Sequence, residues 1–462
     1  MSSKSFLGLC LAALMVITPQ AHATEFKSFE SLKSEFIKRG FSGTVIAKKK
    51  GDVLFEEAFG LAEPTGHRAN TLDTRFGVGS ATKQVTAAAI LILSERGLFK
   101  LDSTLHQLLP EYAFPWAEKV TVHQLLTHTS GIFNYTNTPN LFAIINKLGR
   151  NAKADDLVSL FKDKPLDFEP GSSWSYSNSG YLLAGIIIAK FSGKSYANFI
   201  RTELFEKLGM TKSAYEPWDW NGDNALPMGF DRDYNPTAMS KMPLIFADAA
   251  GGVMSTVRDW SLWLDWLHKG GSILNDESLA LMKTSHVVIP GGTDSYGYGL
   301  FIGKEFGRAM IGHPGDMPGF HFKDMDFIDD DVQIIVASNQ DPSAVRTQMA
   351  TALAGLILEG KAELPDLKLD NSVPEDTLKS YAGHYTWSEM SNDGKLDTLQ
   401  AEVFVDNARL YIRIKDQMEL WLIPQGASHF IIKNVARVEF LESGDLILDQ
   451  GRRYKYVRTP TH

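Results

Sequence analysis

Cysteine is almost absent from this chain. Its 462 residues include one cysteine, Cys10, close to the N-terminus. One cysteine cannot form an intramolecular disulfide or a multi-cysteine metal site. The segment around Cys10 has the features of a removable leader, so we expect a mature chain without cysteine. A thiol nucleophile is therefore excluded, and any covalent catalysis must use another side chain.

Long apolar runs are missing as well. The apolar run nearest the N-terminus, residues 6–17, is shorter than the ~20 residues that a membrane-spanning helix needs. Lys4 precedes this run, and Ala21-His22-Ala23 follows it with the small residues of a cleavage site. This order predicts a secretory signal peptide over residues 1–23. We therefore expect an exported protein, periplasmic or secreted, with no stable insertion in a membrane.

Charge of one sign does not accumulate along the chain. There are 46 Lys and Arg residues against 55 Asp and Glu, a net charge of −9, with no long run of either sign. This balance disfavours nucleic acid as a partner and provides no polybasic membrane anchor. The motifs H-E-x-x-H, Walker loop and strand-linked G-x-G-x-x-G are missing, so we expect neither a metal site nor a cofactor. The G-x-S-x-G elbow of α/β-hydrolases is missing too.

Ser80-Ala81-Thr82-Lys83 is the most informative motif that is present. It precedes an apolar segment, residues 85–93, that has helical spacing and ends before Gly97. Residues i and i+3 share a helix face, so a lysine with a lowered pKa at position 83 could take the proton of Ser80. A second copy, from Ser159 to Lys162, lies in a segment with charges on its outer face. We interpret that copy as an ordinary surface sequence.

Two further motifs follow in the chain. Tyr176-Ser177-Asn178 lies in a turn-rich segment before an apolar helix, and His313-Pro314-Gly315 ends a strand before a Gly/Pro turn. The pattern Y-x-N also occurs at Tyr135 and Tyr196. Tyr196 lies in an amphipathic helical pattern, whereas Tyr135 lies in a polar loop and is a candidate for lining the pocket. We therefore expect Tyr176 to be the catalytic tyrosine.

The motifs S-x-x-K, Y-x-N and H-x-G, in this order, resemble the penicillin-recognising serine hydrolases. That family includes class C β-lactamases, D-alanyl-D-alanine carboxypeptidases, and related carboxylesterases and D-aminopeptidases. Residues 125–132 and 250–256 also resemble its framework segments, so the resemblance spans about residues 42–340. It implies an α+β, β-lactamase/transpeptidase-like fold, in which an antiparallel sheet is flanked by helices and a helical lobe. The cleft would lie between the sheet and that lobe.

The resemblance also implies catalytic roles. Ser80 would be the nucleophile and Lys83 its general base. Tyr176 would shuttle the proton to the leaving group. His313 would support this transfer through a hydrogen bond to Tyr176 or through its electrostatic effect.

Substrate-binding roles follow in the same way. Family geometry implies that the backbone N–H groups of Ser80 and Asp316, the residue after Gly315, stabilise the oxyanion. Asn178 would hold the lysine amine or a substrate carbonyl. Tyr135 is added as a residue that could line the pocket.

One departure from the family pattern bears on the substrate. The third motif of β-lactamases is usually Lys-Thr-Gly, which helps to hold a substrate carboxylate. Here Pro314 brings neither a hydroxyl nor a backbone N–H, and Arg308 is a candidate for supplying the missing cation. We therefore expect a small ester, a D-amino-acid amide or a cell-wall peptide as substrate. The alternatives are a true β-lactamase, or a protein that binds peptidoglycan or β-lactams without turnover.

The sequence divides into three parts after the signal peptide. We assign residues 24–362 to the catalytic domain and residues 363–380, which contain Pro365 and Pro374, to a linker. Residues 381–462 form the third part, where short strand-like runs recur at close spacing. This spacing predicts a small all-β barrel or sandwich.

Overall fold

The computed structural model describes most of the chain. Most of the predicted signal peptide lies outside the part that the structure describes. The described residues are 23–63, 68–139, 141–149, 152–215, 229, 247–290, 292–317, 319–340, 344–365, 373–390, 396–406, 408–414, 419–424, 427–432, 436–449 and 453–459.

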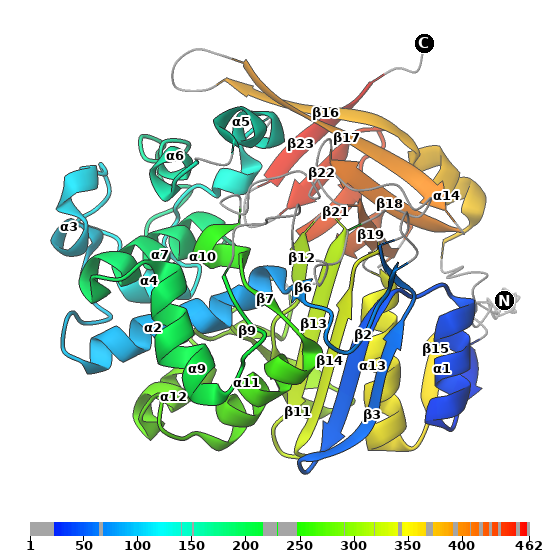
Figure 1. The fold of residues 1–462 in the computed structure, drawn as a ribbon. Helices are drawn as coiled ribbons and strands as arrows, with labels where there is room; N and C mark the ends of the chain where they lie inside the picture. The colour runs from blue at the N-terminus through cyan, green and yellow to red at the C-terminus, as the bar shows by residue number, and fades with distance from the viewer. Residues whose placement is uncertain are drawn as a thin grey trace, which may run out of the picture.

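An antiparallel sheet forms the centre of the larger part of the molecule (Figure 1). Its strands follow the order β3-β2-β14-β13-β11-β10-β9-β8, and β12 pairs with β13 beside this path. Strands β2 and β3 form a hairpin, and β2 also pairs with β14 from the far end of the domain. The strands are β2 (Gly43–Lys49), β3 (Asp52–Phe59), β8 (Val287–Val288), β9 (Ser295–Tyr296), β10 (Phe301–Glu305), β11 (Arg308–Gly312), β12 (Gly315–Met317), β13 (Phe320–Phe327) and β14 (Val332–Ser338).

Helices cover both faces of this sheet (Figure 1). On one face, α1 (Phe29–Lys38) and α13 (Ala344–Glu359) share an apolar cluster with the sheet. On the other face, α2 (Thr82–Glu95) and α11 (Val257–Lys269) belong to a larger cluster. The tryptophans of α11 are buried in that cluster, as expected for a core face.

The helical lobe lies beside α2. Residues of α2 from Thr82 to Leu93 are all buried, because this helix passes between the lobe and the sheet. Helix α7 (Asn178–Ser192) packs against α2 and is also largely buried. The other lobe helices are α3 (Leu105–Leu108), α4 (Val122–Leu126), α5 (Leu141–Leu148), α6 (Ala154–Val158), α8 (Tyr196–Ile200), α9 (Glu206–Leu208), α10 (Asp248–Gly251) and α12 (Asp276–Lys283).

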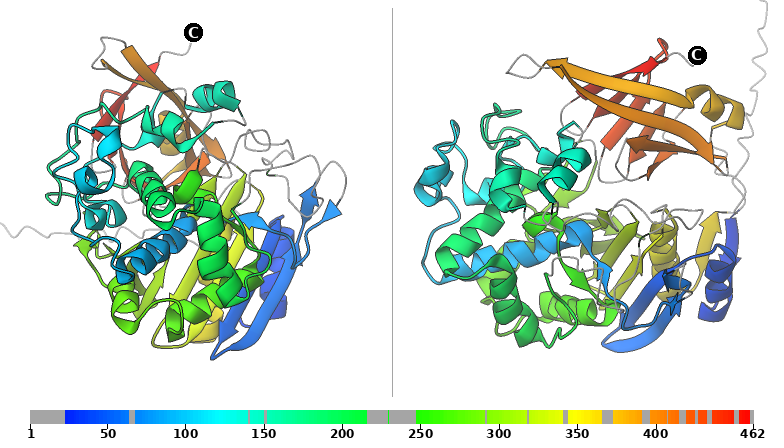
Figure 2. Two further views of the ribbon diagram at one scale, coloured as in Figure 1. Left: turned by 60° about the vertical axis from the view of Figure 1, so that its left-hand side comes forward. Right: turned by 45° about the horizontal axis from the view of Figure 1, so that its top comes forward.

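The C-terminal part is a closed β-barrel with its own core, which settles the choice between barrel and sandwich. Strand β23 pairs back with β16, so the barrel leaves no free sheet edge. Figure 2 shows it packed over one end of the larger part. The strands are β16 (Gly383–Met390), β17 (Leu396–Asp406), β18 (Arg409–Ile414), β19 (Glu419–Pro424), β20 (His429–Ile432), β21 (Ala436–Phe440), β22 (Leu446–Asp449) and β23 (Arg453–Thr459).

The segment assigned to a linker, residues 363–380, contains regular structure at both ends. Strand β15 (Ala362–Pro365) pairs with β1 (Ala23–Phe26) beside the larger part. Helix α14 (Glu375–Tyr381) contributes Leu378 to the core of the barrel. The stretch between β15 and α14, residues 366–374, is therefore shorter than the linker assigned from the sequence.

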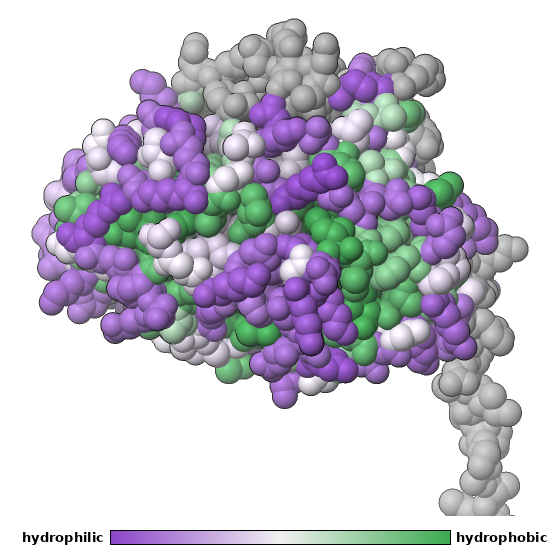
Figure 3. Space-filling model, turned by 60° about the horizontal axis from the view of Figure 1, so that its bottom comes forward, coloured by the Kyte–Doolittle hydropathy of each residue, from purple (hydrophilic) through white to green (hydrophobic). Residues whose placement is uncertain are grey.

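The surface mixes hydrophilic and apolar side chains. Figure 3 shows them interspersed over one face of the molecule. Among the helices that the structure describes, none is both long and apolar enough to cross a bilayer.

Candidate active site

Ser80 lies in a tight turn at the entrance of α2. The turn is a 3₁₀ helix, Gly79–Ala81, and Gly79 has φ +51, a conformation that favours glycine. Strand β12 packs against this turn with its backbone. A Cβ atom on Gly315 would lie 1.8 Å from the carbonyl oxygen of Val78, and one on Gly79 would lie 2.8 Å from the amide nitrogen of Asp316. This contact places the Asp316 amide next to Ser80, in the region expected of the oxyanion donors.

Lys83 lies one helical turn further and reaches back to the serine. Its Nζ is 3.2 Å from Ser80 Oγ, 2.8 Å from Asn178 Oδ1 and 2.7 Å from the carbonyl oxygen of Ala250. A neutral amine has two N–H groups. They can donate hydrogen bonds to the Asn178 amide oxygen and the Ala250 carbonyl oxygen. Its lone pair then faces Ser80 Oγ and can accept the serine proton.

Burial favours the neutral form of this amine. Lys83 has no exposed surface, and desolvation lowers its pKa well below the ordinary lysine value. Among the described residues, no carboxylate lies within ion-pair distance to offset that effect. The geometry and the lowered pKa both fit a general base for Ser80.

Tyr176 lies against the lysine and the serine. The Lys83 amine is 4.7 Å from the centre of the tyrosine ring. Burial raises the pKa of the Tyr176 phenol above its usual value; the Ser80 hydroxyl partly lowers it, and Asp316 raises it further. The phenol oxygen is buried and forms no hydrogen bond within the described part of the chain. The tyrosine therefore holds its proton and can act as a donor.

His128 holds the Tyr176 loop from both sides, and sequence reasoning missed this role. Its carbonyl oxygen accepts the N–H of Ser175 at 3.0 Å, and its Nδ1 accepts the N–H of Ser177 at 3.1 Å. The imidazole and the Tyr176 ring are in contact, with centroids 4.3 Å apart. His128 has φ +60, which is uncommon for a residue with a side chain. The sequence signal for this role was that His128 lies within residues 125–132, which resemble a framework segment of the family.

His313 lies behind Tyr176, but its hydrogen bonds differ from those expected. Its Nδ1 is 2.6 Å from the carbonyl oxygen of Pro314, which can only accept, so Nδ1 carries the proton. Its Nε2 accepts the hydroxyl proton of Tyr296 at 3.0 Å. Both ring nitrogens are thus engaged away from Tyr176, whose ring centroid is 6.1 Å distant. Burial, with Lys83 adding to it, lowers the pKa of His313 to about 3.

Asn178 lies at the first residue of α7. Its Oδ1 accepts from Lys83, and its Nδ2 donates to Thr136 Oγ1 at 3.3 Å. Of the two roles expected for Asn178, the geometry fits the holding of Lys83. Tyr135 is only 1% exposed and belongs to the core cluster, so its side chain offers almost no surface to a substrate.

Among the described residues, the arginine that contacts the H-x-G motif is not the one suggested by the sequence. Arg308 starts β11 at the end away from His313, and it pairs with Asp330 at 2.7 Å and Glu359 at 3.2 Å. Arg346, in the first turn of α13, instead donates to the carbonyl oxygen of Gly315 at 3.1 Å. It lies about thirty residues from the H-x-G motif in sequence, and no local pattern singled it out.

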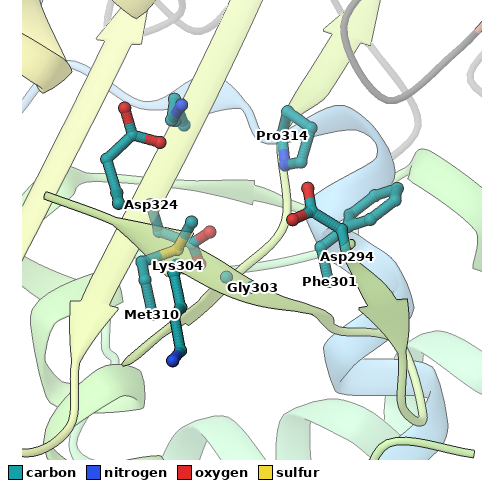
Figure 4. A pocket seen from close by; sticks show the side chains of 10 residues that line it. Asp294, Phe301, Gly303, Lys304, Met310, Pro314 and Asp324 are labelled. Carbon is teal, nitrogen blue, oxygen red and sulfur yellow. The ribbon is translucent and has the colours of Figure 1, made fainter. Parts of the chain in front are cut away.

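A small depression lies behind the H-x-G strand end (Figure 4). Phe301, Gly303, Pro314 and Asp324 are among its lining residues, and Ser80 is not. It is therefore not the space in which Ser80 would react. Among the described residues, no cluster of three or more His, Cys, Asp or Glu side chains is arranged to hold a metal ion.

The fold places the chain among the β-lactamase-type serine hydrolases. A family model described as "Beta-lactamase" matches residues 30–359, and the chain belongs to that family. The catalytic part has the β-lactamase/transpeptidase-like fold expected from the sequence.

Individual relatives extend this comparison. The chain is 28% identical to penicillin-binding protein 4* of Bacillus subtilis (strain 168) over 447 residues, covering 91% of this chain and 96% of the relative. It is 32% identical to esterase EstB of Burkholderia gladioli over 184 residues, 37% of this chain and 46% of the esterase. The octameric penicillin-binding protein homologue from Pyrococcus abyssi superposes with a TM-score of 0.64 and 26% identity, covering 92% of this chain and 99% of that one.

Proposed function

We propose that this protein is an exported serine hydrolase that acts through an acyl-Ser80 intermediate on an ester, a D-amino-acid amide or a cell-wall peptide. One observation carries the proposal: a fully buried lysine amine, with both N–H groups accepted elsewhere, lies 3.2 Å from a serine hydroxyl. The relatives named as penicillin-binding proteins and an esterase support the same class of chemistry.

The reaction follows from these groups. Ser80 Oγ attacks the substrate carbonyl carbon while its proton passes to Lys83 Nζ. The negative charge on the carbonyl oxygen is stabilised by the backbone N–H groups of Ser80 and Asp316. Tyr176 gives its proton to the leaving group as the carbonyl–leaving-group bond breaks, and Lys83 returns a proton to Tyr176. Water then attacks the acyl group, and the serine recovers its proton.

Turnover is favoured over binding alone. The nucleophile, the neutral base and the proton donor are within reach of one another, and a binding protein would not need a neutral lysine there. A true β-lactamase is disfavoured because Pro314 replaces the hydroxyl-bearing residue of Lys-Thr-Gly. A chromogenic cephalosporin, nitrocefin, therefore tests for β-lactamase activity.

The test compares wild type with Ser80→Ala. We expect a fluorophosphonate probe to label the wild type at Ser80, located by peptide mass spectrometry. We also expect hydrolysis of p-nitrophenyl esters, D-amino-acid amides, D-Ala-D-Ala peptides or nitrocefin to depend on Ser80. Labelling without turnover of any substrate would favour the binding protein. Equal labelling and turnover in the Ser80→Ala variant would show that the nucleophile is another residue.

Export is proposed on the sequence pattern alone. The n-region, apolar run and cleavage site within residues 1–23 support it. N-terminal sequencing of the protein recovered outside the cytoplasm should give Thr24 as the first residue. Recovery of the intact N-terminus, with all of the protein in the cytoplasm, would contradict export.

A further inference from the structure

A buried carboxylate lies between two of the motifs that form the candidate site. Asp324, in the middle of β13, is 2% exposed, and no described cation lies within ion-pair distance of it. Its Oδ1 accepts the backbone N–H of His313 at 2.6 Å. Its Oδ2 accepts from Gln84 Nε2 and from Trp260 Nε1, each at 2.7 Å. These three hydrogen bonds join β13 to the H-x-G motif, to α2 and to α11.

The hydrogen bond to His313 replaces a backbone hydrogen bond of the sheet. Ile311 of β11 pairs with Asp326 of β13, so His313 would come opposite Asp324 if β11 continued. The strand instead ends at Gly312, and the Asp324 carboxylate accepts the next N–H. A Cβ atom on Gly312 would lie 2.4 Å from the carbonyl oxygen of Asp324 and 2.9 Å from its Oδ1, so glycine is needed there. The Asp324 side chain therefore fixes the point at which the chain leaves the sheet.

Open space borders the strand end at this point. Gly312, Pro314 and Asp324 line the depression behind it, so packed side chains do not hold the turn on that side (Figure 4). A buried backbone N–H that loses its acceptor costs free energy comparable to a lost hydrogen bond. The position of the His313 backbone therefore depends on the carboxylate that accepts its N–H.

On the helix side, the carboxylate contacts the residue next to the proposed general base. Gln84 follows Lys83 in α2 and is fully buried. Its Nε2 donates to Asp324, and its Oε1 accepts from Trp263 Nε1 at 2.9 Å. An indole N–H can only donate, so the Gln84 amide has one orientation. These hydrogen bonds fix α2 relative to the strand end that carries the H-x-G motif.

We propose that Asp324 is a positioning residue for the proposed hydrolysis: it holds the H-x-G strand end in register with the helix that carries Ser80 and Lys83. Asp324 does not touch the reacting atoms. The alignment keeps Gly315 against the Ser80 turn, where the Asp316 N–H would stabilise the oxyanion. The inference rests on the proposed function, because the quantity that Asp324 affects is the rate of that reaction.

The main test is Asp324→Asn, with Asp326→Asn as its matched control. Asp326 is a fully buried carboxylate two residues further on, on the same face of β13, and it pairs with His268 of α11 at 3.5 Å. Asp324→Asn places an NH₂ group against groups that donate. Turning the Gln84 amide to accept from it would bring the Gln84 NH₂ group against the Trp263 N–H. We therefore expect the strand end to shift in Asp324→Asn.

Steady-state rates with a p-nitrophenyl ester, together with melting temperatures, measure the effect. Asp324→Asn should lower kcat at least tenfold and change KM less than threefold, because a displacement of about 1 Å can cost 10²-fold in rate. Acylation and deacylation use the same oxyanion donors, so kcat should fall whichever step limits it. Asp326→Asn should change kcat and KM less than threefold, even where it lowers the melting temperature as much.

A second pair of variants decides if Asp324→Asn does not fold. Gln84→Leu and Trp260→Phe each remove one donor to Oδ2 of Asp324, but only Gln84 lies on the helix with Ser80 and Lys83. Gln84→Leu should lower kcat at least fivefold, whereas Trp260→Phe should lower it less than threefold, with KM near the wild-type value in both. An unchanged kcat in Gln84→Leu, or a larger loss in Trp260→Phe, overturns the positioning role.

The outcomes also separate this inference from the proposed function. Ser80-dependent turnover with normal kcat in folded Asp324→Asn overturns the role of Asp324 and leaves the hydrolase proposal standing. Equal losses of kcat in Asp324→Asn and Asp326→Asn, or a loss that appears in KM instead of kcat, overturn it as well. Absence of Ser80-dependent turnover with every substrate of the panel overturns the hydrolase proposal, and the positioning role with it.

Discussion

Lys83 is the residue on which the chemistry depends most directly. Because burial lowers its pKa, the amine stays neutral at pH values where an exposed lysine would be protonated. Protonation at lower pH removes the lone pair that faces Ser80. The acid limb of kcat/KM should therefore follow the lowered pKa of Lys83: activity falls as pH decreases through that value and is retained above it. His313 should not set this limb, because its pKa is lowered to about 3.

Replacing Lys83 tests this assignment. We expect Lys83→Met to fold and to lose ~10²–10⁴-fold in kcat/KM, the usual contribution of a general base. The second S-x-x-K copy provides a matched control, since Lys162 is 43% exposed and pairs with Asp163. Lys162→Met should leave kcat/KM unchanged. Steady-state rates with a p-nitrophenyl ester measure both, and a similar loss in the two variants would contradict the assignment.

At the scale of elements, His128 accepts two backbone hydrogen bonds from the Tyr176 loop. His128→Ala removes the acceptor for the Ser177 N–H and the ring that contacts Tyr176. We expect kcat to fall by roughly 10- to 100-fold while fluorophosphonate labelling of Ser80 persists, because a displacement of about 1 Å can cost 10²-fold. His128→Asn should recover part of the loss, since Asn tolerates positive φ and its side-chain oxygen can accept the N–H. Equal losses in both variants would argue against positioning.

The contact between β12 and the Ser80 turn is the second element-scale feature. A Cβ on Gly315 would overlap the carbonyl oxygen of Val78, so Gly315→Ala should push β12 away and displace the Asp316 amide. Loss of one oxyanion donor typically costs ~10²–10³-fold in kcat. Gly292→Ala is the matched control, because its nearest neighbour is 3.8 Å away and its φ is not positive. Near-normal kcat for Gly315→Ala would show that this contact is not needed.

Sequence patterns predicted the individual helices and strands more reliably than the contacts between them. The helix after Ser80 and the short strands of the C-terminal part have periodicity that can be read locally. Alternation of apolar residues is the same in a barrel and a sandwich, so closure of the C-terminal barrel required knowing that β16 meets β23. The hydrogen bonds that His128 accepts from the Tyr176 loop, and the burial of Tyr135, depend on which loops meet in space. No local pattern carries that information.

On the scale of the whole molecule, the barrel touches the loop next to the site. Tyr454 Oη of β23 accepts a hydrogen bond from Asn137 Nδ2 at 3.2 Å, and the neighbouring Thr136 bonds Asn178. Tyr454→Phe removes this hydrogen bond and keeps the ring in the barrel core. We expect a loss of ~0.5–1.5 kcal/mol in the free energy of unfolding and less than a threefold change in kcat/KM. Chemical denaturation and ester kinetics check this, and a large loss of activity with full stability would assign Tyr454 a direct part in catalysis.

The pairing of β2 with β14 also determines at what stage of synthesis the central sheet can fold. Register partners such as Val45 and Val336 come from opposite ends of the catalytic part. The ribosome must therefore release nearly all of that part before the sheet can close, and bringing such distant segments together is slow. Until then the growing polypeptide stays extended enough to be threaded through a translocation pore, which is the state that the proposed export requires.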